Sequence, residues 1–149
     1  MRISTMSAVL CAAAVGIVLG SLPAWLRAAA APSAASSATV HDLMARDLSA
    51  APGKEVRVLT VEYAPGGASL PHRHNAQVFV YVLQGSLRMQ VQGSPLVTLK
   101  PGDAFYEGPD DVHAVSANAS DTEPARFLVF TVKDKAAPVS SAAAQESRP

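Results

Sequence analysis

Residues 65–85 read PGGASLPHRHNAQVFVYVLQG, and this stretch decides the expected fold. It contains an uninterrupted β-favouring run, residues 78–83, which is typical of a strand that is apolar on both faces. His72 and His74 lie just before that run. Because residues two apart in an extended chain point to the same side, both imidazoles are expected to face one point. Two nitrogen ligands for one metal ion are therefore available at this place.

A second turn-rich segment, residues 101–113, reads PGDAFYEGPDDVH and ends at His113. His72 and His74 from one strand and His113 from a distant one would form the minimal set of three ligands on one side of a metal ion. The fourth histidine, His41, is interpreted as a surface residue.

Short β-favouring segments separated by Gly and Pro turns make up the rest of the central region. The first of them changes the phase of its apolar alternation, which a bulge or burial on both faces would explain. Residues 41–48 are expected to form a short helix or an irregular lead-in. The pattern predicts a single all-β sandwich or barrel with strands at residues 55–64, 77–83, 86–92, 96–100, 104–107, 112–117 and 126–133.

The N-terminus has the layout of a secretory signal peptide, residues 1–31, with a basic start, an apolar stretch and small residues before Pro32. An uncleaved membrane anchor is the alternative, although the apolar run is short for a spanning helix. We expect a linker at 32–39, the domain at 40–135 and a flexible tail at 136–149. The protein is then periplasmic or secreted, without other membrane contact.

Charge argues against a nucleic-acid partner, and cysteine content fits an oxidising compartment. Loss of the signal segment leaves 10 of the 12 basic residues and all 12 acidic ones, so no basic nucleic-acid-binding surface is expected. Cys11, the single cysteine, would leave with that segment, and the mature chain would have no disulfide.

The two segments resemble the paired motifs of the cupin family. Gly66, His72, His74 and Gly85 stand at the spacings of the first motif, and Gly102 and His113 at those of the second. The resemblance implies a jelly-roll β-barrel and a metal held by the three histidines. It also implies a homodimer.

The chain departs from these motifs at the glutamate of the first one, where Val78 or Phe79 stands instead. A fourth metal ligand is therefore open between Gln77, Glu107 and water. In the second motif, Pro109 comes one place late and Asp110 replaces a glycine. Asn118 is one place later than the family's asparagine.

The candidate catalytic residues are Glu107, which could act as a base, and Tyr106 beside it, whose hydroxyl needs a partner if buried. Asp110 and Asp111 are expected to serve the turn, or to orient His113. An apolar pocket between the sheets is expected to be filled by large side chains: Phe79, Tyr81, Met89, Phe105, Tyr106, Phe127 and Phe130.

Two classes of function follow from these residues and the resemblance. The first is an oxygenase-type enzyme that acts on a small organic molecule, because three histidines leave open positions on the metal and favour anionic substrates. The second is a non-catalytic cupin that binds a metal or a small ligand. The metal is a divalent transition ion, Fe, Zn, Mn, Ni or Cu, since imidazole suits all of them.

Overall fold

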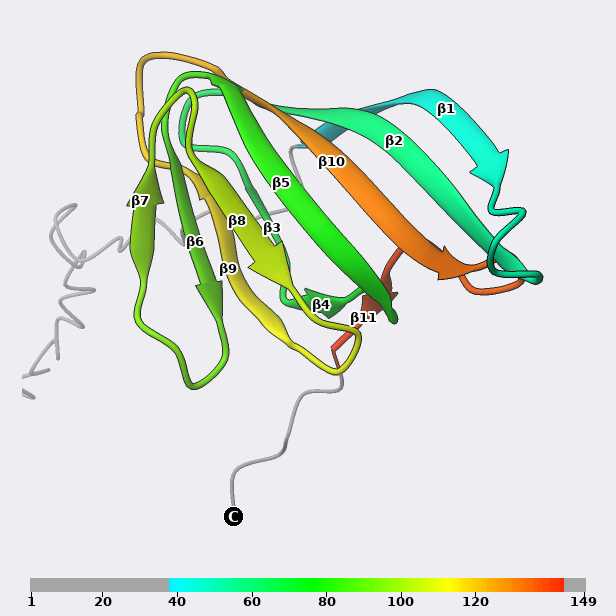
Figure 1. The fold of residues 1–149 in the computed structure, drawn as a ribbon. Coiled ribbons are helices and arrows are strands. Elements are labelled where there is room, and N and C mark those ends of the chain that lie inside the picture. The colour runs from blue at the N-terminus through cyan, green and yellow to red at the C-terminus, as the bar shows by residue number, and fades with distance from the viewer. Residues whose placement is uncertain (1–37, 144–149) are drawn as a thin grey trace, which may run out of the picture. The chain divides into compact units, whose positions relative to one another are not determined.

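Two antiparallel sheets make up the part of the chain that the computed structural model describes, residues 38–143 (Figure 1). The five-stranded sheet has the order β1 (Ala38–Asp47), β2 (Lys54–Tyr63), β10 (Ala125–Asp134), β5 (Ala76–Gln84) and β8 (Ala104–Glu107). The six-stranded sheet has the order β11 (Ser141–Ala142), β4 (His72–Arg73), β9 (His113–Asn118), β6 (Leu87–Val91) and β7 (Val97–Leu99), and β3 (Ala68–Ser69) pairs with β9. The expected all-β class is confirmed.

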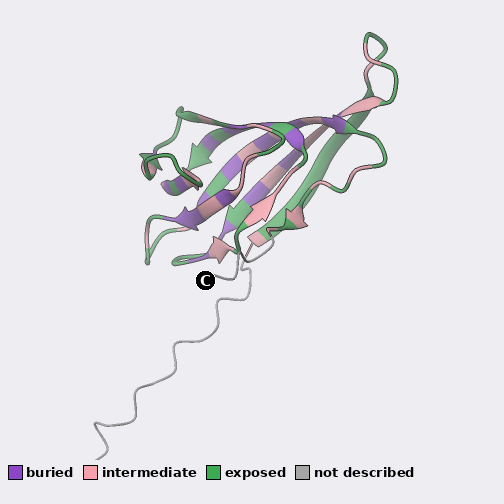
Figure 2. Cartoon of the chain, turned by 90° about the horizontal axis from the view of Figure 1, so that it is seen from below, coloured by how far each residue is buried: buried purple, intermediate pink, exposed green. Residues whose placement is uncertain are grey.

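Strand β5 alternates regularly between buried and exposed residues, as the banding in Figure 2 illustrates for the strands. Val78, Val80 and Val82 point into the space between the sheets and are at most 3% exposed. Each contributes about 1.5–3 kcal/mol by leaving water. The residues between them face outward and are 40–47% exposed in the case of Phe79, Tyr81 and Leu83, so the strand is apolar on both faces, as expected, but buried on only one. The five-stranded sheet has no second layer on its outer face among the described residues.

The core takes its large side chains from both sheets. Leu87 and Met89 come from the six-stranded sheet, and Tyr63 and Phe127 from the five-stranded one. The larger set of aromatic residues expected in the pocket is corrected here. Four of its members lie on the outer face: Phe79, Tyr81 and Tyr106, which are 45–50% exposed, and Phe130, which is directly opposite Phe79.

Residues 41–48 do not form a helix or a lead-in, because residues 38–47 are strand β1, paired antiparallel with β2. The expected bulge exists, but on β1, where the register shifts between Asp42 and Met44. Strand β2 itself stays in continuous register with β10. His41 is exposed on β1, as expected.

The described strands extend beyond residues 40–135 at both ends. Residues 136–142, which were expected to be part of a flexible tail, include β11, whose Ala142 pairs with His72 of β4. Val139 packs against the core. The turn before it is held by the buried Lys133, whose Nζ donates to the carbonyl of Ala137 and lies 2.8 Å from Glu55 Oε1.

Residues 1–37 and 144–149 lie outside the described residues, so the predicted signal peptide at 1–31 and most of the linker are not described. Within residues 38–143, no helix is long and apolar enough to cross a membrane.

Candidate metal centre

His72 is placed by the short strand β4, and its ring is fixed by a backbone carbonyl. Its Nδ1 lies 2.7 Å from the carbonyl oxygen of Leu70. A carbonyl oxygen only accepts hydrogen bonds, so Nδ1 carries the proton and Nε2 is left with a lone pair. Burial lowers the pKa of His72, while the bond to Leu70 raises it by less. The imidazole is therefore kept in the neutral form that binds metals.

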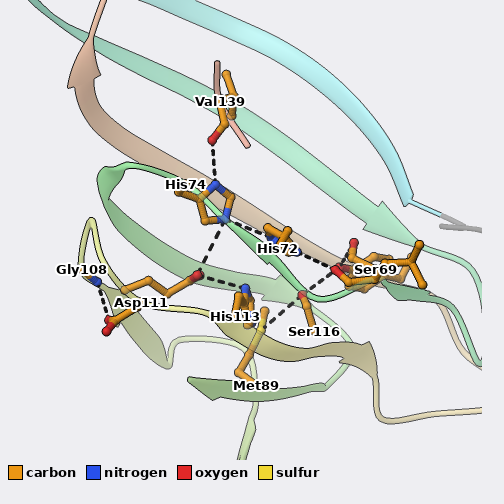
Figure 3. Close-up of polar contacts among 12 residues, drawn as sticks. Ser69, His72, His74, Met89, Gly108, Asp111, His113, Ser116 and Val139 are labelled. Atoms are coloured by element: carbon orange, nitrogen blue, oxygen red, sulfur yellow. Dashed lines mark hydrogen bonds and ion pairs between the residues drawn. The ribbon is translucent and has the colours of Figure 1, made fainter. Parts of the chain in front are cut away.

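His74 is oriented in the same way by a residue near the C-terminal end of the described chain. Its Nδ1 donates to the carbonyl oxygen of Val139 at 2.8 Å (Figure 3). Immediately after it, Asn75 adopts a left-handed backbone conformation, φ 47°, which asparagine tolerates better than most residues. The chain turns there and passes from the six-stranded sheet into β5 of the other sheet.

The Nε2 atoms of His72 and His74 face each other at 3.0 Å. With both protons on Nδ1, two lone pairs would meet at this distance without a proton between them. A proton on Nε2 would charge a ring, which the burial of His72 disfavours. A bound cation satisfies both atoms.

His113 comes from β9, directly opposite His72 in the strand register. It is 3% exposed, and neither of its ring nitrogens makes a hydrogen bond, although Nδ1 lies 3.1 Å from Oε2 of Glu107. A buried polar atom with no partner, such as Nε2 here, is costly and rare in proteins. The potential ligand atoms of His72, His74 and His113 all lie within 4.8 Å of one another. The three side chains therefore fit a divalent metal ion, and the sequence-based expectation that they converge is met.

Glu107 of β8 is the carboxylate beside this cluster. It is 2% exposed, and its Oε2 lies 3.1 Å from Nδ1 of His113 and 3.7 Å from Nε2 of His74. A buried carboxylate needs a nearby positive charge to offset the loss of its hydration. In the register of β5 and β8, Glu107 lies directly opposite Val78. The carboxylate missing from the motif position on β5 is thus present one strand away.

The structure places two of the expected site residues elsewhere. Gln77 is the neighbour of the inward-facing Val78 and points to the outer face, where its Oε1 accepts a hydrogen bond from the hydroxyl of Tyr106. Tyr106 precedes the inward-facing Glu107 and is outward for the same reason. The expectations of Gln77 as a metal ligand and Tyr106 as a catalytic residue are therefore corrected.

The aspartates of the turn before His113 accept hydrogen bonds that stabilise this turn and join it to β4. Asp111 Oδ2 accepts a hydrogen bond from the backbone N–H of Gly108 at 2.7 Å, and the carbonyl of Asp110 accepts one from Arg73. Neither aspartate orients His113, because no hydrogen bond joins either of them to its ring. The turn role expected for Asp111 is confirmed.

A cavity of about 540 Å³ lies between the sheets, with the three histidines and Glu107 in its wall. Its remaining wall is largely apolar, from residues such as Leu59, Val61 and Phe127, and Val139 to Ala142 also contribute. Arg57 lines it as well. The sequence analysis missed Arg57 and Val139, since neither belongs to a motif and only strand register brings them to this cavity.

Comparison with known proteins agrees with this architecture. A sequence model of the Cupin domain matches residues 59–131. A recombinant oxalate oxidase in complex with glycolate is similar in structure, with 25% identity, TM-score 0.52, and coverage of 66% of this chain and 52% of that one.

Two further solved structures share the fold. A DMSP lyase from Ruegeria pomeroyi has 19% identity and TM-score 0.53, with 62% of this chain and 45% of that one covered. A cupin-like protein from Thermotoga maritima has 22% identity and TM-score 0.57, with 71% and 75% covered.

The chain spans about half the length of the oxalate oxidase and of the DMSP lyase. No sequence among curated proteins matches. The conserved-domain match, the two-sheet architecture and the structural likeness agree, and the chain belongs to the cupin superfamily.

Proposed function

We propose that this protein is a metal-dependent, oxygenase-type enzyme that acts on a small organic molecule. The observation that carries the proposal is the convergence of His72, His74 and His113, two of which face each other at 3.0 Å through their Nε2 atoms. When bound, a divalent transition metal supplies open positions for an oxygen-bearing substrate and dioxygen. The similarity to an oxalate oxidase in complex with glycolate supports redox chemistry on a small acid.

The chain's own residues have separate tasks in this proposal. Leu70 and Val139 hold the two facing imidazoles in the ligating tautomer through their carbonyl oxygens. Glu107 balances the charge of the ion and supplies the carboxylate absent from position 78. The apolar wall around Leu59 and Phe127 excludes water from the substrate.

Export to the periplasm or the exterior belongs to the same proposal. It is supported by the signal-like pattern of residues 1–31 and by the lack of cysteine after Cys11.

A homodimer is also proposed, through the outer face of the five-stranded sheet. Phe79, Tyr81 and Tyr106 are 45%, 47% and 50% exposed there, and Phe79 lies 5.3 Å from Tyr106 between ring centroids. An outward sheet face usually carries polar residues, so a contiguous aromatic patch supports contact with a second copy.

The decisive experiment measures the metal content of the protein after purification without chelators or an affinity tag. We expect about one equivalent of metal, lost in His72→Ala and His113→Ala and retained in His41→Ala, whose histidine is exposed on β1. The metal-loaded protein is then tested for dioxygen uptake with enolisable acids and diketones. Metal binding without uptake would support the non-catalytic alternative, and no metal even after reconstitution would overturn the proposal.

A further inference from the structure

Arg57 lies in the wall of the same cavity as the histidines, on β2, three strands away from Glu107 of β8 in the five-stranded sheet. It is opposite Thr131 of β10, which is opposite Val78 of β5, which is opposite Glu107 of β8. The four residues form one row across the inner face of the sheet. With about 4.8 Å between neighbouring strands, the backbones of Arg57 and Glu107 are roughly 14 Å apart.

The guanidinium group of Arg57 is incompletely paired. One nitrogen, Nη2, lies 2.6 Å from Oδ1 of Asp42, but Nε is buried and has no hydrogen-bond partner. Arginine remains charged at every relevant pH, so it cannot remove the cost of an unpaired buried N–H by losing a proton. Thr131, directly opposite, also has a buried hydroxyl without a partner.

A purely structural role for Arg57 accounts for only part of this arrangement. Its ion pair with Asp42 links β2 to β1, but the Asp42 side chain is 60% exposed, and such pairs contribute little stability. An exposed ion pair does not require the arginine to line an apolar cavity or to leave a buried Nε unpaired. A ligand oxygen would satisfy this atom.

We propose that Arg57 binds the carboxylate of the substrate, whose other end reaches the histidine cluster. The planar guanidinium presents its N–H groups in the geometry that a carboxylate accepts. Between the two ends, the cavity wall is mostly apolar, with Val40, Leu59 and Val61 near Arg57. The ligand class is therefore a small organic acid with an apolar carbon skeleton. That the opposite end of the substrate binds a metal at the histidines rests on the proposed function. Binding of the carboxylate by Arg57 does not.

The test uses the metal-free protein, so that binding at the histidines does not contribute. Isothermal titration calorimetry compares hexanoate with 1-hexanol, a neutral probe of equal chain length. We expect hexanoate to bind at least about tenfold more tightly, and Arg57→Met to abolish that preference. Arg57→Lys keeps the positive charge but loses the two parallel N–H groups of the guanidinium. It should weaken hexanoate binding less than Arg57→Met does. Arg46→Met, which changes an exposed arginine on the adjacent strand β1, should have no effect.

Asp42→Asn separates a binding role from a structural one. If Arg57 is a carboxylate site, removing its competing anion should tighten hexanoate binding. If the pair only links two strands, Asp42→Asn should weaken binding in the same way as Arg57→Met, and the proposal is overturned. It is equally overturned if Arg57→Met binds hexanoate as the unmodified protein does. A protein that binds hexanoate through Arg57 but takes up no divalent transition metal after reconstitution would keep this inference and lose the proposed metal function.

Discussion

The carbonyl oxygen of Val139 accepts a hydrogen bond from Nδ1 of His74, although the two residues are 65 positions apart. The contact is held in place because β11 pairs with β4 directly beside it, with Ser141 opposite Arg73. A segment at the C-terminal end of the domain is thus part of the metal centre. Its backbone determines which nitrogen of His74 faces the other histidines.

We therefore expect a chain that ends at Pro138 to bind Zn²⁺ about 10–100-fold more weakly than the full chain, the usual range for loss of a group that orients a ligand. The main strands of both sheets remain, so circular dichroism should still report a β-fold. Zinc affinity is measured by competition with a chromophoric chelator.

A chain that ends at Ala143 is the matched control for this truncation, because it keeps Val139 and β11. It should bind zinc as the full chain does. Equal affinity in the chain ending at Pro138 would mean that the Val139 carbonyl has no part in ligand orientation.

Short β-favouring segments separated by Gly and Pro turns were enough to predict the all-β fold, and the resemblance to the paired cupin motifs predicted the meeting of the three histidines. Neither could place Glu107, because that position depends on the pairing of β8 with β5, a long-range contact that no local pattern encodes. Side chains alternate between the two faces of β5, so Gln77 points outward because Val78 points inward. The sequence did not reveal which face is buried, because the outward residues of this strand are also apolar. Val139 was unpredictable for a different reason, since it contributes a backbone oxygen, which has no sequence signature.

Variants of Glu107 and Val78 test whether the Glu107 carboxylate takes the place of the one that is absent at position 78. Glu107→Val should lower zinc affinity about 10–100-fold, and adding Val78→Glu should restore part of it by returning the carboxylate to the opposite strand. In the metal-free protein, Glu107→Gln should raise the melting temperature, because it removes a buried charge that lacks a cation. Unchanged zinc affinity in Glu107→Val would rule out this role for the residue.

The aromatic outer face of the five-stranded sheet gives a prediction for assembly. Tyr81→Glu should convert a dimer to a monomer, since it places a charge within the patch formed with Phe79 and Tyr106. Light scattering after size exclusion gives the mass. Leu96→Glu is the control, because Leu96 is 51% exposed and lies just before β7 of the other sheet. A monomeric unmodified protein would disprove the dimer.

Tyr63 predicts how the stability of the fold depends on alkaline pH. Burial raises its pKa above the ordinary value of about 10, and the hydrogen bonds with Ser116 and Ser69 lower it by less. Above that ordinary value the unfolded chain releases the phenolic proton while the folded chain keeps it. Stability is therefore highest below pH 10 and falls as the pH rises toward the folded pKa.

In urea unfolding at pH 9 and pH 11, Tyr63→Phe should show a smaller loss of stability between the two values than the unmodified protein. At pH 9 the variant should be less stable by about 1 kcal/mol, because the hydroxyls of Ser69 and Ser116 lose a shared partner. An identical pH dependence in Tyr63→Phe would show that another group governs alkaline unfolding.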